Sequence, residues 1–564
     1  MPLEPFQDEL PRLGRMTKLA TSPADEDWYE VAVTAFSHTF HTRLNPIPVW
    51  GYDGTYPGKV FDTPRDRLVQ VTWINRLTLG MPEKFPFEVI PSPYPMPGDT
   101  EHADHTTKPG HTVVHLHGAH VPADSDGWPE SFLHPAGGHG HSSAIFRYPN
   151  HQPGAMLWYH DHTMHITRLN VYAGLAGPYI LRDPNEADLK LPCDQYEIPL
   201  ILQDRTFDSP DSPTALWHEV TADQPEFFGE YIVANGKVWP FCTVEARRYR
   251  FRVVNGANSR FFRLGVRLQT GNRSRTPSIF QIGTDGGFLP APVEIGTTDL
   301  PRLTLAPGER ADLIVDFTSC QPGDEFILTN DAPAPFPGGG DSTLDPATTG
   351  VVLKFVVKAV IGIDSSQLPA ALSHNFNTNI GGEQVPLVND DWSSNENNLN
   401  TKLAAAYPKD PRASIRYRTR TLTEEADKMV LLDTRRWEEP VTETPVVDGV
   451  EIWNIDNRTG DEHPIHVHLV QFLILDRKPL PDNTKPALPL DPNERGWKDT
   501  VRCYSGERTR IIARFTDYTG WYVWHCHMLE HEDHDMMRPM YVRCPHEPDG
   551  VQVPRPDQPG IHHH

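Results

Sequence analysis

Four His-x-His pairs lie far apart in this sequence, and the last of them encloses a cysteine. The pairs are His115/His117, His160/His162, His466/His468 and His525-Cys526-His527. In a β-strand successive side chains point to opposite faces, so the two histidines of each pair share a face and can bind neighbouring metal ions. Cys526 then points to the other face. We therefore predict two different metal centres joined by the backbone around Cys526.

A second ligand set is centred on the cysteine. His531 follows Cys526 by five residues, and Met536 follows His531 by five more. A thiolate, two imidazoles and a weakly bound methionine are the ligands of a blue-copper electron-transfer site. We expect the second imidazole from His463, three residues before the third His-x-His pair. Met537 competes for the methionine position, and we favour Met536.

The remaining histidines have simpler interpretations, because 28 histidines in 564 residues produce some pairs by chance. His139-Gly-His141 lies in a glycine-rich loop with no strand pattern around it, so we interpret it as an ordinary loop feature. A further metal site there is the alternative. His120, His165 and His534 each follow a proposed ligand by three residues, a spacing that does not keep a strand's face. We expect them to contact ligand residues or to lie at the surface.

The strands that carry these ligands belong to a weak internal repeat. Three segments of alternating apolar and polar residues end in asparagine, at intervals of 180 and 202 residues: Arg67–Asn75, Tyr249–Asn255 and Val450–Asn457. The 56 prolines and 40 glycines are dispersed, which favours many short strands with ordered loops. The sequence predicts an all-β protein of three similar units.

The unit boundaries follow changes in composition. A strand-like run gives way to charged residues and proline near residue 184, and the sequence becomes polar and asparagine-rich from about residue 361. We therefore predict domains at 1–184, 185–360 and 428–548, a connector at 361–427, and a tail at 549–564. The final His562–His564 resembles a purification-tag remnant and is excluded from the site.

Charge and hydropathy exclude several kinds of partner. The net charge is −24 without a basic cluster, which argues against binding to nucleic acid or to an anionic membrane. No run approaches the ~20 apolar residues of a membrane span. The first residues show no secretory signal, so we expect a cytoplasmic or spore-coat-associated protein, or the mature form of an exported one.

Six cysteines are present, and five remain once Cys526 is assigned to a metal. An odd number leaves at least one unpaired, so this is not a disulfide framework. Cys503 and Cys544 both end strand-like runs, and a bridge between them stays open as a minor possibility.

At these residues the chain resembles the three-domain multicopper oxidases, most closely the bacterial spore-coat laccases and bilirubin oxidases. The resemblance covers nearly the whole chain. Beyond the metal motifs it rests on Trp50–Gly58, Asp124–Glu130, Ala234–Pro240, Gly283–Leu289, Ala306–Arg310, Gly496–Thr500 and Asp535–Pro539. It implies three cupredoxin-like Greek-key β-barrel or sandwich domains and four copper ions. A type 1 copper is expected in the third domain, and a trinuclear cluster between the first and third.

The resemblance also assigns each ligand. The type 1 ligands are His463, Cys526, His531 and Met536. The type 2 ligands are His115 and His466. The type 3 pair takes His117, His160, His162, His468, His525 and His527.

Two carboxylates match positions that similar enzymes use for proton supply or charge compensation, Asp126 and Glu532. Carboxylates near such a cluster can deliver protons when their pKa is suitably tuned. The alternative is that each only orients a ligand histidine.

The implied function is the one-electron oxidation of phenols, aromatic amines or bilirubin-like pigments, coupled to four-electron reduction of O2 to water by a monomer. The alternatives are a metallo-oxidase of cuprous or manganous ions, an aminophenol-coupling oxidase, and a non-catalytic copper-binding coat protein. Cuprous oxidases of this kind carry methionine-rich insertions, whereas this chain has 11 methionines and no such tract.

One departure concerns a disulfide in the middle domain of the related spore-coat laccase. The matching positions here are Phe228 and the cysteine-free loop 333–350, so we expect no such bridge. A disulfide typically contributes ~2–4 kcal/mol, and its loss puts extreme robustness in doubt.

Overall fold

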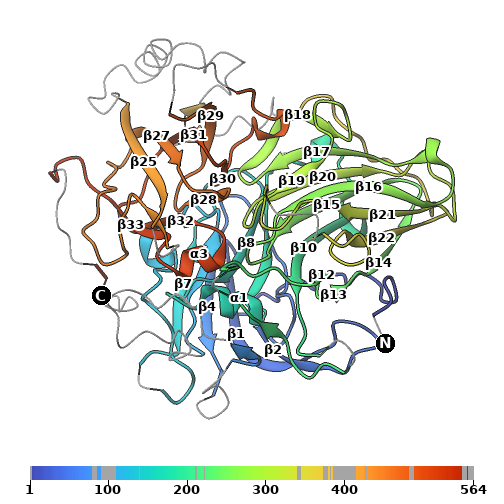
Figure 1. The fold of residues 1–564 in the computed structure, drawn as a ribbon, viewed down its shortest axis with the longest axis horizontal. Helices are drawn as coiled ribbons and strands as arrows, with labels where there is room; N and C mark the ends of the chain where they lie inside the picture. Colours follow the sequence, from blue (N-terminus) through green and yellow to red (C-terminus); the bar gives the residue numbers. More distant parts are fainter. Residues whose placement is uncertain are drawn as a thin grey trace.

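The protein is built from three β-sandwiches arranged around a common centre (Figure 1). The computed structural model describes residues 3–78, 85–89, 110–138, 140–184, 186–209, 212–221, 223–338, 344–372, 379–380, 383–384, 415–425, 429–481, 488–548 and 555–556. Strands dominate these residues, and the structure confirms the predicted all-β class.

Each sandwich pairs two sheets in which adjacent strands are hydrogen-bonded. In order across its two sheets, the first unit has β2 (Ile47–Tyr52), β1 (Glu26–His38), β4 (Leu68–Asn75), β7 (Ser143–Tyr148), and β3 (Phe61–Pro64), β9 (Ala176–Arg182), β8 (Met156–Asp161), β6 (Val114–His117). The second has β13 (Lys237–Val238), β12 (Tyr231–Ala234), β10 (Glu197–Arg205), β15 (Arg248–Asn255), β20 (Arg310–Asp316), β17 (Ser278–Thr284), β18 (Gly287–Ile295), and β14 (Phe241–Glu245), β22 (Val351–Lys358), β21 (Glu325–Asn330), β16 (Phe262–Thr270), β19 (Leu303–Leu305). The third has β26 (Val430–Leu432), β25 (Arg416–Glu424), β27 (Val450–Asn457), β31 (Glu507–Arg514), β29 (Phe472–Pro479), and β30 (Thr500–Cys503), β28 (His463–Val467), β32 (Gly520–Cys526), β33 (Met537–Val542).

The internal repeat corresponds to one structural position in each unit. The three repeat segments contain β4, β15 and β27, and each of these strands runs parallel to an earlier strand of its own unit, β1, β10 or β25. The terminal asparagine is buried in each case. Its side-chain amide donates to two backbone carbonyls, and its side-chain oxygen accepts the N–H two residues on. The same amide therefore ties the strand end to neighbouring loops three times.

The third unit begins earlier than its predicted start at residue 428. Strand β25 lies inside the segment 361–427 that the composition predicts as a connector, and it pairs with β27 over seven residues. Its outward side chains, Tyr417, Thr419, Thr421 and Thr423, are mostly polar, because only one face of this strand is buried. That polar face makes the strand resemble a linker in the sequence.

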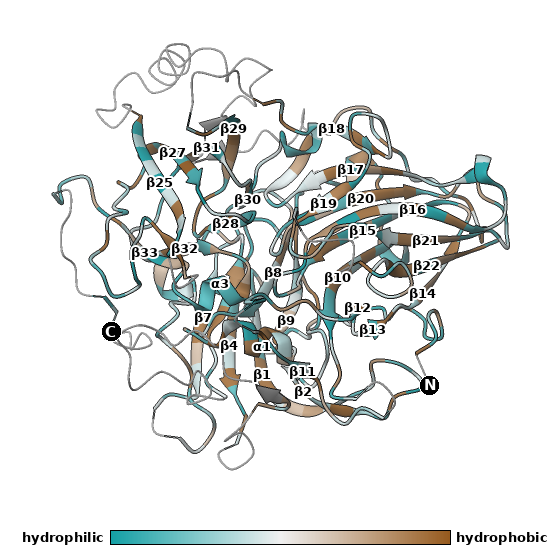
Figure 2. Cartoon of the chain, viewed as in Figure 1, coloured by the Kyte–Doolittle hydropathy of each residue, from teal (hydrophilic) through white to brown (hydrophobic). Residues whose placement is uncertain are grey.

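The chain's first residues also depart from the simple division into units. The backbone N–H groups of Phe6 and Leu10 donate to the carbonyls of Trp239 and Phe241, so the start of the chain lies along the second unit. One continuous hydrophobic core spans the first and second units, and a separate core fills the third. Apolar and polar residues alternate along the strands, as Figure 2 shows.

Two short helices meet where the three units converge (Figure 1). Helix α3 (Leu529–Asp533) of the third unit contacts α1 (Thr167–Ala173) of the first. Asp533 accepts hydrogen bonds from the backbone N–H groups of Thr167 and Arg168 and from the Arg168 guanidinium. Glu530 accepts them from Asn258 and Ser259 of the second unit. One turn of helix therefore anchors the third unit to both others.

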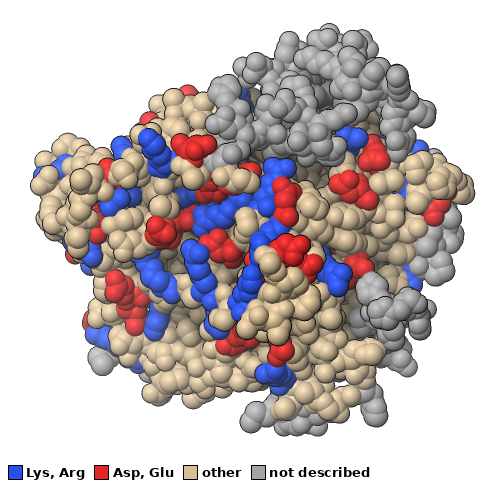
Figure 3. Space-filling view, turned by 180° about the vertical axis from the view of Figure 1, so that it is seen from behind, with Lys and Arg blue, Asp and Glu red and all other residues tan. Residues whose placement is uncertain are grey.

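Acidic and basic side chains are interspersed on the face drawn in Figure 3. Among the described residues, no helix is both long and apolar enough to cross a membrane.

The repeated asparagine gives a prediction about stability. Asn255→Ala should lower the free energy of unfolding by about 2–4 kcal/mol, because two carbonyls and one N–H lose their buried partner. Urea unfolding measures the change. Asn454→Ala is the control, since the Asn454 side chain makes one long contact of 3.4 Å to Thr419. Equal losses in both variants would contradict a special role for the strand-end amide.

Candidate metal centres

Two antiparallel strand pairs carry the four His-x-His motifs. In the first unit β6 pairs with β8, which places His115 opposite His160. In the third unit β28 pairs with β32, which places His466 opposite His525. The second histidine of each motif lies two residues further along, on the same face. Each unit therefore presents four imidazoles on one surface.

The two surfaces meet, and the eight imidazoles become one buried cluster. The rings of His115 and His468 stack with centroids 3.8 Å apart, and those of His117 and His466 stack at 3.7 Å. Each stack joins the first unit to the third. Their nitrogens form three groups in which all donor atoms lie within 4.8 Å: His115/His117/His466, His117/His160/His527 and His162/His468/His525.

The hydrogen bonds at this cluster suit neutral imidazole ligands. The Nδ1 atoms of His115, His160 and His466 donate to backbone carbonyls at 2.6, 2.8 and 2.8 Å. Their Nε2 atoms are buried and have no hydrogen-bond partner. Burial lowers the pKa of His160 and of His466 to about 3, which keeps these rings neutral with the Nε2 lone pair available. Inward lone pairs and outward N–H groups are what metal-binding histidines require.

The second centre lies on the other face of β32, as the alternation predicts. Cys526 Sγ is 3.6 Å from His463 Nδ1 and 3.8 Å from His531 Nδ1, and the three residues are buried. The outer nitrogen of His463 is 2.7 Å from Thr459 Oγ1. The thiol and the two inward nitrogens form a fourth group that could hold a metal ion.

The strand register separates the two methionines. In the β32–β33 pair His525 lies opposite Met537, so the next position along places Met536 opposite Cys526. Directly opposite residues share a face of the sheet. Met536 belongs to the same apolar cluster as Cys526, whereas Met537 packs with Trp128, Trp437 and Trp521 on the other side. This geometry favours Met536.

Both predicted carboxylates contact ligand histidines. Asp126 Oδ2 is 2.7 Å from His468 Nδ1, while its Oδ1 makes no hydrogen bond and lies 3.7 Å from His115 Nδ1. Burial raises the pKa of this carboxyl well above its usual value. Glu532 Oε2 lies 3.2 Å from His525 Nδ1, and its Oε1 lies 3.6 Å from His162 Nδ1. Burial raises the pKa of Glu532, but the neighbouring His525 and His162 outweigh it and bring it to about 2.

Two more carboxylates at the centres were not predicted. Glu226 of the second unit has its Oε1 3.0 Å from His531 Nε2. Asp499 has its Oδ1 3.0 Å from His117 Nε2. Asp499 lies in the Gly496–Thr500 segment that carries the family resemblance, so the sequence could have pointed to it as a site residue. Glu226 lies two residues before Phe228, and no ligand-like spacing in the sequence identifies it as a site residue.

The other singled-out histidines stay outside the metal groups. His120 Nδ1 is 3.1 Å from the carbonyl of Leu469, and its Nε2 is 2.9 Å from Asp517 Oδ2. His165 Nδ1 is 3.1 Å from the carbonyl of Asp533. Both therefore bridge the first and third units next to the ligands. His534 is buried behind α3. His139 lies outside the described residues, and His141 is exposed.

The cysteines other than Cys526 form no disulfide in the described structure. Cys503 is buried beside the thiolate centre, where it lies opposite His463 on β30, and Cys544 is partly exposed. The suggested bridge between them is therefore absent. Phe228 lies instead beneath the Arg260 guanidinium, whose carbon is 5.6 Å from the ring centroid.

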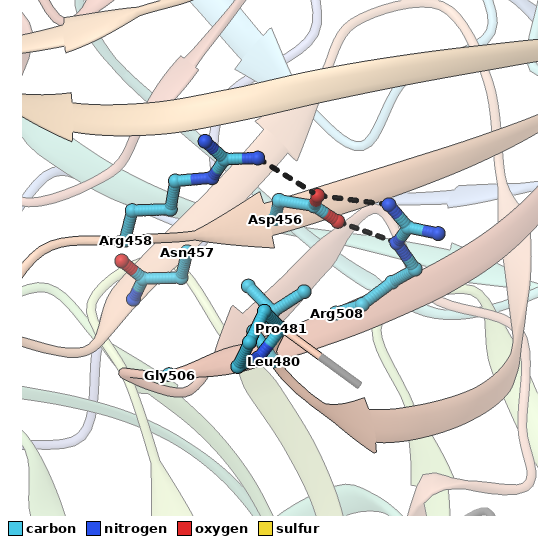
Figure 4. A pocket seen from close by; sticks show the side chains of 7 residues that line it. All are labelled: Asp456, Asn457, Arg458, Leu480, Pro481, Gly506 and Arg508. Atoms are coloured by element: carbon cyan, nitrogen blue, oxygen red, sulfur yellow. Dashed lines mark hydrogen bonds and ion pairs between the residues drawn. The ribbon is translucent and has the colours of Figure 1, made fainter. Parts of the chain in front are cut away.

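A cavity of about 390 Å³ lies away from both centres, at the end of β27 (Figure 4). Its walls are Asp456, Asn457, Arg458, Leu480, Pro481, Gly506 and Arg508. Asp456 neutralises Arg508 through contacts of 2.5 and 2.8 Å. None of the predicted metal ligands is among the described residues that line this cavity.

Comparison with known proteins agrees with this geometry. Family models described as multicopper oxidase match residues 105–186 and 410–545. A laccase of Bacillus subtilis (strain 168) is 40% identical over 577 residues, covering 97% of this chain and 100% of that protein. The chain belongs to the multicopper oxidase family.

More distant relatives also match over nearly the whole chain. The multicopper oxidase LPR1 of Arabidopsis thaliana is 30% identical, covering 96% of this chain and 93% of that protein. The crystal structure of a laccase from Pediococcus acidilactici superposes with a TM-score of 0.70 at 26% identity, covering 96% of this chain and 95% of that one. Multicopper oxidases hold one type 1, one type 2 and two type 3 coppers. The histidine groups and the thiolate group fit this complement.

The register argument predicts different effects for the two methionines. Met536→Leu should raise the type 1 reduction potential, because a weak axial donor that stabilises the oxidised copper is lost. Met537→Leu is the matched control and should leave the potential unchanged, since this side chain packs among tryptophans. Redox titration of the blue absorption measures both. A shift in Met537→Leu alone would reverse the assignment.

Proposed function

We propose that this multicopper oxidase is a laccase that takes single electrons from small aromatic reductants beside Cys526 and uses them to reduce O2 at the eight-histidine cluster. Phenols, aromatic amines and bilirubin-like pigments are the substrate class. The observation that carries the proposal is the alternation at Cys526, whose thiol faces His463 and His531 while His525 and His527 face the cluster. When bound, the coppers supply the one-electron steps that link the two substrates.

We assign the ligands as the geometry groups them. Cys526, His463, His531 and Met536 hold the type 1 copper. His115 and His466 hold the type 2 copper, and their unpartnered Nε2 atoms support this. The type 3 pair divides the other six histidines into His117/His160/His527 and His162/His468/His525, three for each metal.

The backbone at Cys526 offers a short route between the two centres. The carbonyl oxygen of Cys526 accepts a hydrogen bond of 3.0 Å from His525 Nδ1. The thiolate residue therefore contacts a cluster ligand through its own peptide group as well as through the chain. This contact supports transfer of electrons from the reductant side to the oxygen side.

The two carboxylates have different roles in this proposal. Asp126 holds His468 through Oδ2 and contacts His115 through its backbone carbonyl, so it orients ligands. Glu532 is buried between His162 and His525, with its two oxygens 3.6 and 3.2 Å from their Nδ1 atoms. Its position beside two cluster histidines supports a role in relaying protons to the cluster, where oxygen reduction consumes four of them. Asp126 can contribute through its Oδ1, which makes no hydrogen bond.

A metal-ion reductant is the second candidate, and Glu226 favours it. This buried carboxylate contacts the edge of His531 at 3.0 Å. Burial, and then the charge of Glu226, raises the pKa of the half-buried Asp461, which places a second carboxylate in the same environment. Two acidic groups beside a type 1 ligand would attract a cuprous or manganous ion.

The proton-supply role makes a kinetic prediction. Glu532→Gln should slow oxygen reduction by about 10²–10⁴-fold, the usual contribution of a general acid, while reduction of the type 1 site without oxygen is preserved. Stopped-flow absorption follows each step separately. Glu530→Gln is the control, because Glu530 is equally buried but bonds to Asn258 and Ser259. Equal slowing of both steps would indicate a merely orienting carboxylate.

An oxygen-uptake panel tests the function itself. The copper-loaded protein should consume O2 with a phenol, an aminophenol or bilirubin faster than with cuprous or manganous ions. Glu226→Gln keeps an acceptor for His531 but removes the charge, so it should depress uptake with metal ions more than with aromatics. Glu230→Gln, an exposed carboxyl on the same loop, is the control. Uptake with metal ions alone would favour the second candidate, and none at all would refute an oxidase.

A further inference from the structure

One histidine of the cluster is held the opposite way round from its neighbours. His115, His160 and His466 donate from Nδ1 and turn Nε2 inward. His117 is instead held at Nε2, which lies 3.0 Å from Asp499 Oδ1. Its Nδ1 therefore faces the cluster, 3.1 Å from His527 Nε2. A hydrogen bond to one imidazole nitrogen decides which nitrogen can bind a metal.

Asp499 positions two cluster histidines at once. Its side chain accepts from His117, and its backbone carbonyl accepts from His466 Nδ1 at 2.8 Å. The Thr500 hydroxyl lies 3.1 Å from His117 Nε2 and 2.9 Å from Asp499 Oδ1, which closes the network. The stacked pair His117/His466 is therefore fixed by one residue from the outside.

Arg310 of the second unit keeps this carboxylate charged and in place. Both terminal nitrogens of its guanidinium contact Asp499, Nη1 at 2.7 Å from Oδ1 and Nη2 on Oδ2. The same guanidinium donates to the carbonyls of Met156 in the first unit and of Gly308 in its own. Arg310 and Asp499 are each 1% exposed, so the pair is screened from solvent. A buried charge left without its partner is strongly destabilising.

Two glycines leave space here, one for the ion pair and one for the histidine cluster. A side chain on Gly118, which follows His117 with φ +88°, would come within 2.5 Å of Arg310 Nη2 and Asp499 Oδ2. A side chain on Gly308 of the second unit would lie 2.8 Å from the His527 ring. The unit that carries none of the predicted ligands thus packs directly against the cluster.

We propose that Arg310 is a positioning residue through which the middle domain controls copper binding at the trinuclear cluster, by holding Asp499 on His117 and His466. The middle domain then contributes to the metal centre as well as to the scaffold. This inference rests on the proposed function, because it takes the eight histidines as copper ligands. Losing such an outer partner typically weakens metal affinity about 10–100-fold.

Arg310→Met tests the proposal through copper content and spectra. Chelator competition with inductively coupled plasma mass spectrometry should show that cluster copper is bound about 10–100-fold more weakly. The type 2 electron paramagnetic resonance signal should shift or weaken, and the blue type 1 absorption should persist as evidence of folding. Arg310→Lys keeps the charge and should restore much of the affinity. Asp499→Asn should behave like Arg310→Met.

Arg250→Met is the matched control for general loosening. Arg250 is also 1% exposed, lies on the neighbouring strand β15 and pairs with Asp312, but Asp312, unlike Asp499, contacts none of the ligand histidines in the described structure. The Arg250→Met variant should be less stable than the wild type and should keep all its copper. Wild-type affinity in Arg310→Met, or equal copper loss in Arg250→Met, would overturn the proposal. If the wild-type cluster itself takes up no copper, the proposed function fails instead.

Discussion

The alternation of side chains along β32 is the constraint on which the rest of the protein depends. Neighbouring residues of a strand cannot face the same side, so Cys526 and its flanking histidines must serve different centres. The distance between the centres is therefore set by covalent geometry. The carbonyl of Cys526 reinforces the link by accepting from His525. The fold must then complete each ligand set with residues from other strands.

Completion of the cluster depends on contact between units. The first and third units each contribute four histidines, and the stacks between His115 and His468 and between His117 and His466 cross their interface. Helix α3, which follows His527 directly in the chain, fixes that interface, because Asp533 binds the first unit and Glu530 binds the second. His531 lies between Glu530 and Asp533 on this helix, belongs to the thiolate centre, and contacts Glu226 of the second unit. A shift of any one unit would thus disturb both centres.

Eight neutral imidazoles in a buried site need hydrogen-bond acceptors around them, and the structure supplies these from backbone carbonyls and a few carboxylates. Burial depresses the pKa of His160 and His466, so these two imidazoles remain neutral at physiological pH. Carboxylates such as Asp126, Glu532 and Asp499 can offset the charge of bound metal ions. Their number and depth are consistent with a site that carries several cations.

The sequence by itself determined whatever depends on local geometry. Spacing of two assigned the histidine pairs to strand faces, spacing of five linked Cys526 to His531 and Met536, and the strand-end asparagines revealed three units. The sequence did not predict strand β25, because the outward face of this half-buried strand is polar and its composition resembles that of a linker. Tertiary structure alone decided the partners that come from other units, as Glu226 on His531 and Arg310 on Asp499 show. Such contacts join residues separated by about 200–300 positions, where no periodicity of the chain relates one side chain to the other and only packing brings them together.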